Sequence, residues 1–221
     1  LNLQNLAYAL ATVGLMQICT PVLAQASTDT LAGWTTAGDV STDGDAVVLT
    51  TAFLDGAQDA LLNRSGLSAV EVGVLEQNAG LPAYSLDLSV SQYATEGSSA
   101  TQSFDVLAGQ TLKFSWSFST VDTQFEDHAF VVLGDQVVTL ASQSQPGVAS
   151  QWFSYTFDHA ASLKFSVGVV DTGDYLGVST LKVDHLTLSP VPEPSGFALA
   201  LLGLAAISFK HRRMRSAKVT G

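Results

Sequence analysis

The feature that most constrains the fold of this chain is a strict alternation of apolar and polar residues, which recurs through its middle part. In residues 111–118, Thr-Leu-Lys-Phe-Ser-Trp-Ser-Phe, every second side chain is large and apolar. A period of two is that of a β-strand, whose successive side chains point to opposite faces of a sheet. We therefore expect a half-buried strand, with Trp116 on the core face beside Phe114 and Phe118.

Residues 151–157 and 162–169 repeat this alternation. Five further segments combine strand-forming residues with flanking turn residues, and they are residues 46–50, 102–106, 130–133, 136–140 and 178–188. About eight short strands separated by turns predict a mainly β chain, folded as an antiparallel β-sandwich.

One segment departs from the alternation. Residues 68–71, Ser-Ala-Val-Glu, have the form of a capping box, in which Ser68 and Glu71 satisfy each other's backbone amides at the start of a helix. Apolar residues at helical spacing follow, and residues 78–80, Asn-Ala-Gly, indicate a stop. We expect one short helix at residues 68–77. The competing interpretation is a strand, because valines also alternate in this segment.

The C-terminal segment, residues 191–221, has three parts: a proline-glutamate-proline motif, an apolar run and a basic cluster. Their defining residues are Pro192, Glu193 and Pro194, then Phe197 and Phe209 at the ends of the run, then Arg212 and Arg213. The prolines withhold ladder hydrogen bonds and keep the motif extended and accessible. A run that is apolar on every face is typical of a transmembrane helix. It would reach about 20 Å of the roughly 30 Å hydrocarbon layer, and snorkelling cations would extend it and place this end on the cytoplasmic side.

These three parts, in this order, resemble the PEP-CTERM sorting domain of Gram-negative bacteria that make extracellular polysaccharide. The resemblance covers residues 191–215. It implies that an exosortase, a membrane-embedded processing enzyme, recognises the chain as a substrate, cuts it near the proline motif and passes it to the cell surface or matrix. The alternative is an ordinary C-terminal anchor that is never cleaved, but such an anchor has no use for the motif and prefers a longer span.

The N-terminal residues indicate export. Residues 6–18 are rich in alanine and leucine, and Ala24-Gln25-Ala26 has the small-x-small pattern of a signal-peptide cleavage site, so we expect residues 1–26 to be a signal peptide. The absence of a cation before the apolar run departs from a complete signal. The one cysteine, Cys19, lies in this segment, so the exported domain would have no disulfide and no thiolate site.

Residues 27–190 are long enough for one domain with its own core. This region is strongly acidic: of the 20 acidic residues only Glu193 lies outside it, whereas five of the nine basic residues lie in the C-terminal tail. Such a charge repels nucleic acid and anionic membrane surfaces, so neither is an expected partner of the domain. Solubility outside the cell is the simplest interpretation of the charge.

The order of glycines, aromatics and turns over residues 31–188 also resembles a galactose-binding-like jelly roll. The residues that carry this resemblance include Gly33, Trp34, Trp116, Trp152 and Asp184. It implies a jelly-roll form of the sandwich, which occurs in carbohydrate-binding families and in the ectodomains of many proteins with the same tail. The resemblance supports the fold more than a ligand.

Trp152 is the candidate carbohydrate contact. In residues 151–157, alternation places Phe153 and Tyr155 on one face and Trp152 on the other, with serine and threonine. An indole on a polar face offers its π surface to the apolar C–H face of a sugar ring. The alternative is that a neighbouring loop covers Trp152, because packed tryptophans are more common than sugar platforms.

Calcium is the cofactor that the sequence suggests. In residues 38–45, Gly-Asp-Val-Ser-Thr-Asp-Gly-Asp, Asp39, Asp43 and Asp45 place carboxylates around a flexible glycine. Calcium prefers such hard oxygen ligands, although the spacing is not that of an EF-hand loop. Jelly rolls of the resembled kind often hold calcium between the early chain and the final strand, which implies Asp184 as a further ligand.

An ordinary turn is the alternative to this metal site. Asp-Gly pairs favour turns, and carboxylates in a turn are normally solvated. The same alternative holds for residues 171–174, Asp-Thr-Gly-Asp.

No catalytic motif stands out in the chain. The four histidines are isolated from one another, and residues 66–70, Gly-Leu-Ser-Ala-Val, lack the final glycine of a nucleophile elbow. Two carboxylates from distant strands can meet to hydrolyse a glycoside, but the sequence singles out no pair.

The sequence therefore predicts a non-enzymatic exported protein, tethered to the inner membrane before processing and then placed at the cell surface or in an exopolysaccharide, biofilm-type matrix. A carbohydrate-binding, lectin-like module of that matrix is the second hypothesis. A surface glycan hydrolase is the third.

Overall fold

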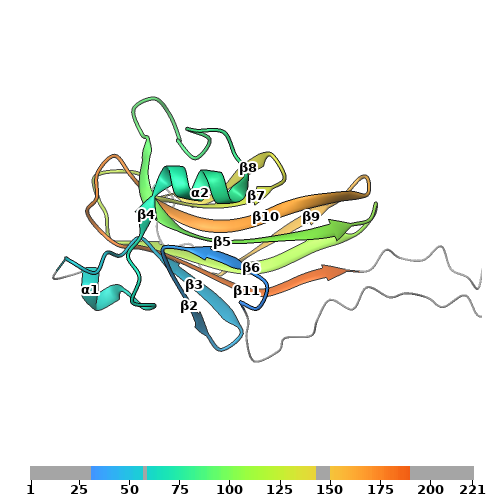
Figure 1. The fold of residues 1–221 in the computed structure, drawn as a ribbon, viewed down its shortest axis with the longest axis horizontal. Coiled ribbons are helices and arrows are strands. Elements are labelled where there is room, and N and C mark those ends of the chain that lie inside the picture. Colours follow the sequence, from blue (N-terminus) through green and yellow to red (C-terminus); the bar gives the residue numbers. More distant parts are fainter. Residues whose placement is uncertain (1–30, 57–58, 143–149, 190–221) are drawn as a thin grey trace, which may run out of the picture.

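The computed structural model describes residues 31–56, 59–142 and 150–189, which form two antiparallel β-sheets packed face to face (Figure 1). The predicted β-sandwich is therefore confirmed, and its two-sheet arrangement is consistent with a jelly roll. The expected signal peptide, residues 1–26, and the sorting segment, residues 191–221, lie outside the described residues. Within the described ranges, no helix has the length and apolar character needed to cross a membrane.

The first sheet has six strands, in the order β1, β5, β10, β7 and β8, with β4 also paired to β5. Its strands are β1 (Thr35–Ala37), β4 (Val70–Glu71), β5 (Ala94–Val106), β7 (His128–Leu133), β8 (Gln136–Ser142) and β10 (Ala161–Thr172). The second sheet has five, in the order β2, β3, β11, β6 and β9. They are β2 (Asp39–Asp43), β3 (Ala46–Thr50), β6 (Thr111–Thr120), β9 (Gln151–Thr156) and β11 (Ser179–Ser189).

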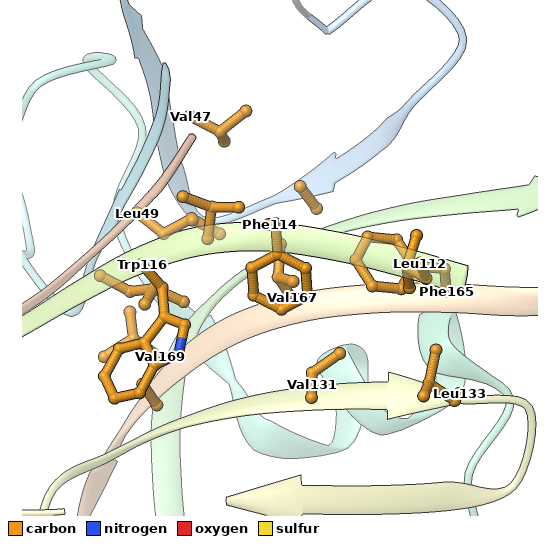
Figure 2. Packing of buried hydrophobic residues seen from close by; sticks show 14 of the residues in the cluster. Val47, Leu49, Leu112, Phe114, Trp116, Val131, Leu133, Phe165, Val167 and Val169 are labelled. Atoms are coloured by element: carbon orange, nitrogen blue, oxygen red, sulfur yellow. The ribbon is translucent and has the colours of Figure 1, made fainter. Parts of the chain in front are cut away.

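The central core lies between the two sheets and is built from the apolar faces that alternation predicts (Figure 2). Phe114 and Trp116 of β6 point into it and are 0% and 4% exposed. Phe165 of β10 faces them from the first sheet, with its ring 6.0 Å from that of Phe114 in an edge-on arrangement. Trp34 meets the same Phe165 ring at 5.8 Å. The prediction for residues 111–118 is thus confirmed.

Part of the outer face of the first sheet is buried as well, because α2 (Val72–Ala79) lies across it (Figure 1). Leu75 of this helix packs in one cluster with Phe130 and Val132 of β7. The alternating neighbour Val131 faces the central core instead. Every residue of β7 is therefore buried, whereas the second half of β5 and the first half of β10 keep exposed residues.

Helix α2 begins four residues later than the predicted start at residue 68. Val70 and Glu71 pair with β5 as strand β4, so the competing strand interpretation holds for these two residues. The expected capping box is absent: the Ser68 hydroxyl accepts a hydrogen bond from the amide of Leu54 at 3.0 Å, and the Glu71 side chain makes no cap. Pairing with the sheet outweighs the local capping signal.

The end of α2 agrees with the prediction. Gly80 follows the helix with a φ of 79°, a left-handed conformation that a residue without Cβ adopts at little cost. Its amide donates to the carbonyl of Gln77 at 3.1 Å. A second helix, α1 (Asp59–Leu62), was not predicted, because its four residues bury no side chain and so show no apolar periodicity.

A substitution at Gly168 of β10 tests how tightly the first sheet is packed. A Cβ at this position would lie 2.7 Å from Phe130 Cε1 and 2.8 Å from the Ser98 carbonyl oxygen. Gly168→Ala is therefore expected to lower the free energy of unfolding by about 2–3 kcal/mol, measured by urea denaturation.

Gly73→Ala is the matched control. Gly73 lies in α2 with open space around its missing Cβ, so alanine should stabilise the protein by about 0.5–1 kcal/mol. Equal stability changes for the two variants would show that β10 and the Phe130 ring are not packed as described.

Candidate functional site

The outer face of the second sheet carries the predicted carbohydrate contact. Trp152 of β9 is 57% exposed, and no loop of the described residues covers it. Its alternating neighbours, Ser154 and Thr156, are exposed on the same face. The orientation that the sequence predicted is therefore confirmed, and the covering-loop alternative is wrong for the part of the chain that the structure describes.

The core side of β9 fixes this orientation. Phe153 stacks on Phe114 of the neighbouring strand, with ring centroids 4.9 Å apart and planes 23° from parallel. The register pairs Phe153 with Phe114 and Trp152 with Ser115. Because successive side chains point to opposite faces, anchoring Phe153 in the core directs Trp152 outward.

Two side chains from neighbouring strands flank the indole of Trp152. The ammonium of Lys113 on β6 lies 4.3 Å from the ring centroid, at cation–π distance. The imidazole of His185 on β11 lies with its centroid 6.0 Å from the indole, at an interplanar angle of 47°. The sequence analysis named neither residue for this site. The alternation of residues 111–118 places Lys113 on the outer face, whereas His185 has no comparable signal.

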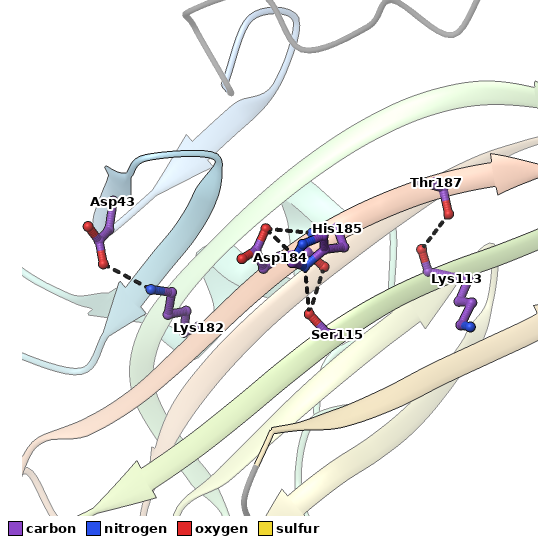
Figure 3. A network of polar contacts seen from close by, with 7 residues as sticks. All are labelled: Asp43, Lys113, Ser115, Lys182, Asp184, His185 and Thr187. Carbon is purple, nitrogen blue, oxygen red and sulfur yellow. Dashed lines mark hydrogen bonds and ion pairs between the residues drawn. The ribbon is translucent and has the colours of Figure 1, made fainter.

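A bulge in β11 places His185 beside the tryptophan. The register of β11 against β6 shifts between Asp184 and Thr187, and His185 has a φ of 55°. Its amide donates to Asp184 Oδ1 at 2.7 Å, and its Nδ1 lies 3.3 Å from the Ser115 hydroxyl, as Figure 3 shows. The Ser115 hydroxyl also donates to the Asp184 carbonyl at 3.2 Å. These bonds hold the imidazole on the outer face.

The resulting surface combines an exposed aromatic ring with polar groups close to it. The indole can stack on the apolar face of a sugar ring, while an ammonium, an imidazole and nearby hydroxyls can hydrogen-bond to sugar hydroxyls. We call Trp152, Lys113 and His185 the tryptophan face.

The predicted calcium ligands are not brought together. Asp39 is fully buried, and its carboxylate accepts hydrogen bonds from the Thr50 hydroxyl and from the amides of Arg64 and Ser65. Asp39 therefore holds β2 to β3 and to the segment after α1. This is a correction of the metal prediction, because its oxygens already have protein donors.

The other three aspartates of that prediction are separate from Asp39. Asp43 forms an ion pair with Lys182 at 2.9 Å, and the hydrogen bond and charge of Lys182 lower the pKa of the Asp43 carboxyl (Figure 3). Asp184 accepts from the His185 amide, and Asp45 is exposed at the β2–β3 turn. None of the four belongs to the one group of three carboxylates within 4.8 Å that the described residues contain. The turn interpretation is confirmed for Asp45, which lies exposed in the β2–β3 turn, whereas Asp43 ends β2 with its carboxylate paired and Asp39 is buried.

Comparison with known proteins adds little. No protein-family model and no curated protein matches the chain. Among solved structures, one described as "CBM4 structure and function" aligns with a TM-score of 0.32 and 12% identity, over 71% of this chain and 86% of that one.

The variant Asp39→Ala tests whether Asp39 has a structural role or binds a metal ion. The variant leaves the buried Thr50 hydroxyl and the amides of Arg64 and Ser65 without an acceptor, so its free energy of unfolding should fall by about 2–4 kcal/mol. The loss should be the same with calcium and with a chelator, while Asp45→Ala should change stability by less than about 0.5 kcal/mol. A loss for Asp39→Ala that appears only with calcium present would restore the metal assignment.

Proposed function

We propose that this chain is an exported, non-enzymatic protein of the cell surface or extracellular matrix, sorted and cut by an exosortase at its C-terminal segment. The order of the proline-glutamate-proline motif (Pro192, Glu193 and Pro194), the apolar run and the cations Arg212 and Arg213 carries this proposal. The last described strand, β11, ends at Ser189, so the motif follows the folded domain directly. The acidic β-sandwich is then the cargo, and the membrane holds the chain until it is processed.

Replacing the three motif residues with alanine in the producing cell tests the sorting proposal. The wild-type chain should reach the surface or matrix without its C-terminal segment, while the variant should remain uncut in the inner membrane. Pro190→Ala, next to the motif, is the control and should behave as the wild type. Intact wild-type chain in the mature surface fraction, shown by mass spectrometry, would contradict cleavage.

Glycan binding by the tryptophan face is the second candidate function. The observation that favours it is the exposure of Trp152 beside Lys113 and His185. Lys113 is also one of only four basic residues between positions 27 and 190. A positive group beside the stacking plane of an acidic domain should select sugars that carry carboxylates over neutral ones.

Binding of the cell's own exopolysaccharide tests this second function. Trp152→Ala should weaken binding at least about tenfold, because truncating an aromatic anchor at the centre of an interface typically costs more than 1.4 kcal/mol. Lys113→Ala should weaken binding to acidic glycans more than to neutral ones. Tyr84→Ala, which removes an aromatic ring that is 80% exposed outside the second sheet, should leave binding unchanged. Equal binding by wild type and Trp152→Ala would exclude the tryptophan face.

A further inference from the structure

A second polar cluster lies at the end of the sandwich where β5 begins and β10 ends (Figure 1). Asp122 comes from the loop after β6, Asp171 from the end of strand β10, and Asp174 from the loop before β11. One carboxylate oxygen of each residue lies within 4.8 Å of the others. Asp171 is buried and the other two are half-buried, so the group opens toward solvent on one side.

The backbone around this group is firmly held. The register of β10 against β5 shifts between Val170 and Thr172, which sets Asp171 at an irregular position of the strand. The Thr95 hydroxyl lies 3.1 Å from the carbonyl oxygen of Asp171 and 2.7 Å from that of Asp174. Gly173, with a φ of 82°, donates its amide to the Tyr93 carbonyl at 2.9 Å. The carboxylates are therefore presented by a fixed frame.

Glu96 of β5 is the observation that points to a ligand. Its side chain is 1% exposed, and neither of its carboxylate oxygens has a hydrogen-bond partner. Asp171 Oδ1 is likewise buried without a partner. No lysine or arginine of the described residues forms an ion pair with either residue. A buried carboxylate without a donor or a counter-charge is costly, and such groups are normally paired or coordinate a metal.

The charges of this region repel one another. The Glu96 carboxyl lies next to that of Asp171, and burial, with the nearby charges of Asp127 and Glu71, raises the pKa of Glu96 to about 7. Burial and the charges of Asp127 and Glu96 also raise the pKa of Asp171. Asp127 differs from Glu96 because it has donors, the Ser179 hydroxyl and the Thr172 amide. Glu96 and Asp171 Oδ1 therefore lack both a donor and a counter-charge, whereas Asp127 has donors.

We propose that Asp122, Asp171 and Asp174 bind a calcium ion, with the buried Glu96 as a further negative charge next to them. The group contains neither histidine nor cysteine, and an all-oxygen donor set favours calcium or magnesium over transition metals. Calcium accepts the irregular geometry of ligands drawn from two loops and one strand, whereas magnesium requires a near-ideal octahedron. The ion would join the loop after β6 to the loop after β10. This site shares no residue with the one that the sequence predicted, and it does not depend on glycan binding.

Calorimetric titration of the metal-free, full-length protein with calcium chloride tests the site. One calcium ion should bind per chain, and magnesium should bind at least about tenfold more weakly. Asp174→Asn preserves the shape of a half-buried side chain and should lower calcium affinity at least about tenfold, as should Glu96→Gln. Asp45→Asn, an exposed member of the site predicted from the sequence, is the control and should bind as the wild type.

Terbium luminescence gives a second readout that does not depend on heats of binding. Tyr175 directly follows the proposed ligand Asp174 in the chain, so a lanthanide bound there should lie close enough to a tyrosine ring to be sensitised. Emission should fall when calcium is added and should be weak in Asp174→Asn. The proposal is overturned if calcium does not bind the wild type, or if Asp174→Asn and Glu96→Gln both bind it as tightly as the wild type does.

Discussion

The pairing of β5 with β10 is the contact on which the rest of this structure depends. These strands, of 13 and 12 residues, run side by side through the first sheet, and the first eight residues of β5 and the last eight of β10 are all buried. Their close fit requires glycine at Gly97 and Gly168, since a Cβ at either would overlap the neighbouring backbone or the Phe130 ring. Helix α2 packs on the outer face of this strand pair, and the second sheet packs on its inner face.

Where β5 begins and β10 ends, both faces of the first sheet are covered. Buried polar groups there therefore need a hydrogen-bond partner or a ligand. The Ser98 hydroxyl donates to the Thr50 carbonyl and so ties β5 to the second sheet, and Thr101 donates to Ser166. Glu96, on the same strand, has no such donor. The burial that stabilises the sheet thus creates the requirement for a cation there, whereas the second sheet keeps an outer face on which Trp152 is exposed.

The sequence was informative wherever a strand has one face in the core and one in water. Residues 111–118 show this pattern, and both their strand and its buried face were predicted correctly. The first half of β5 has buried threonine, serine and glutamate on both faces, so it shows no alternation, and only residues 102–106 were predicted. The tryptophan face was predicted in part, because His185 reaches it through a bulge. The cluster of Asp122 and Asp171 with Glu96 depends on pairing between distant strands, which spacing along the chain does not reveal.

Of the two proposed functions, the one that concerns the described residues is glycan binding by the outer face of the second sheet. Its most direct test is an NMR titration of isotope-labelled protein with oligosaccharides from the producing cell's exopolysaccharide. The account predicts that the indole N–H signal of Trp152 and the amide signals of β6, β9 and the β11 bulge shift together, while those of α2 and β8 stay fixed. Shifts confined to other parts of the protein, or no shifts at saturating oligosaccharide, would contradict it.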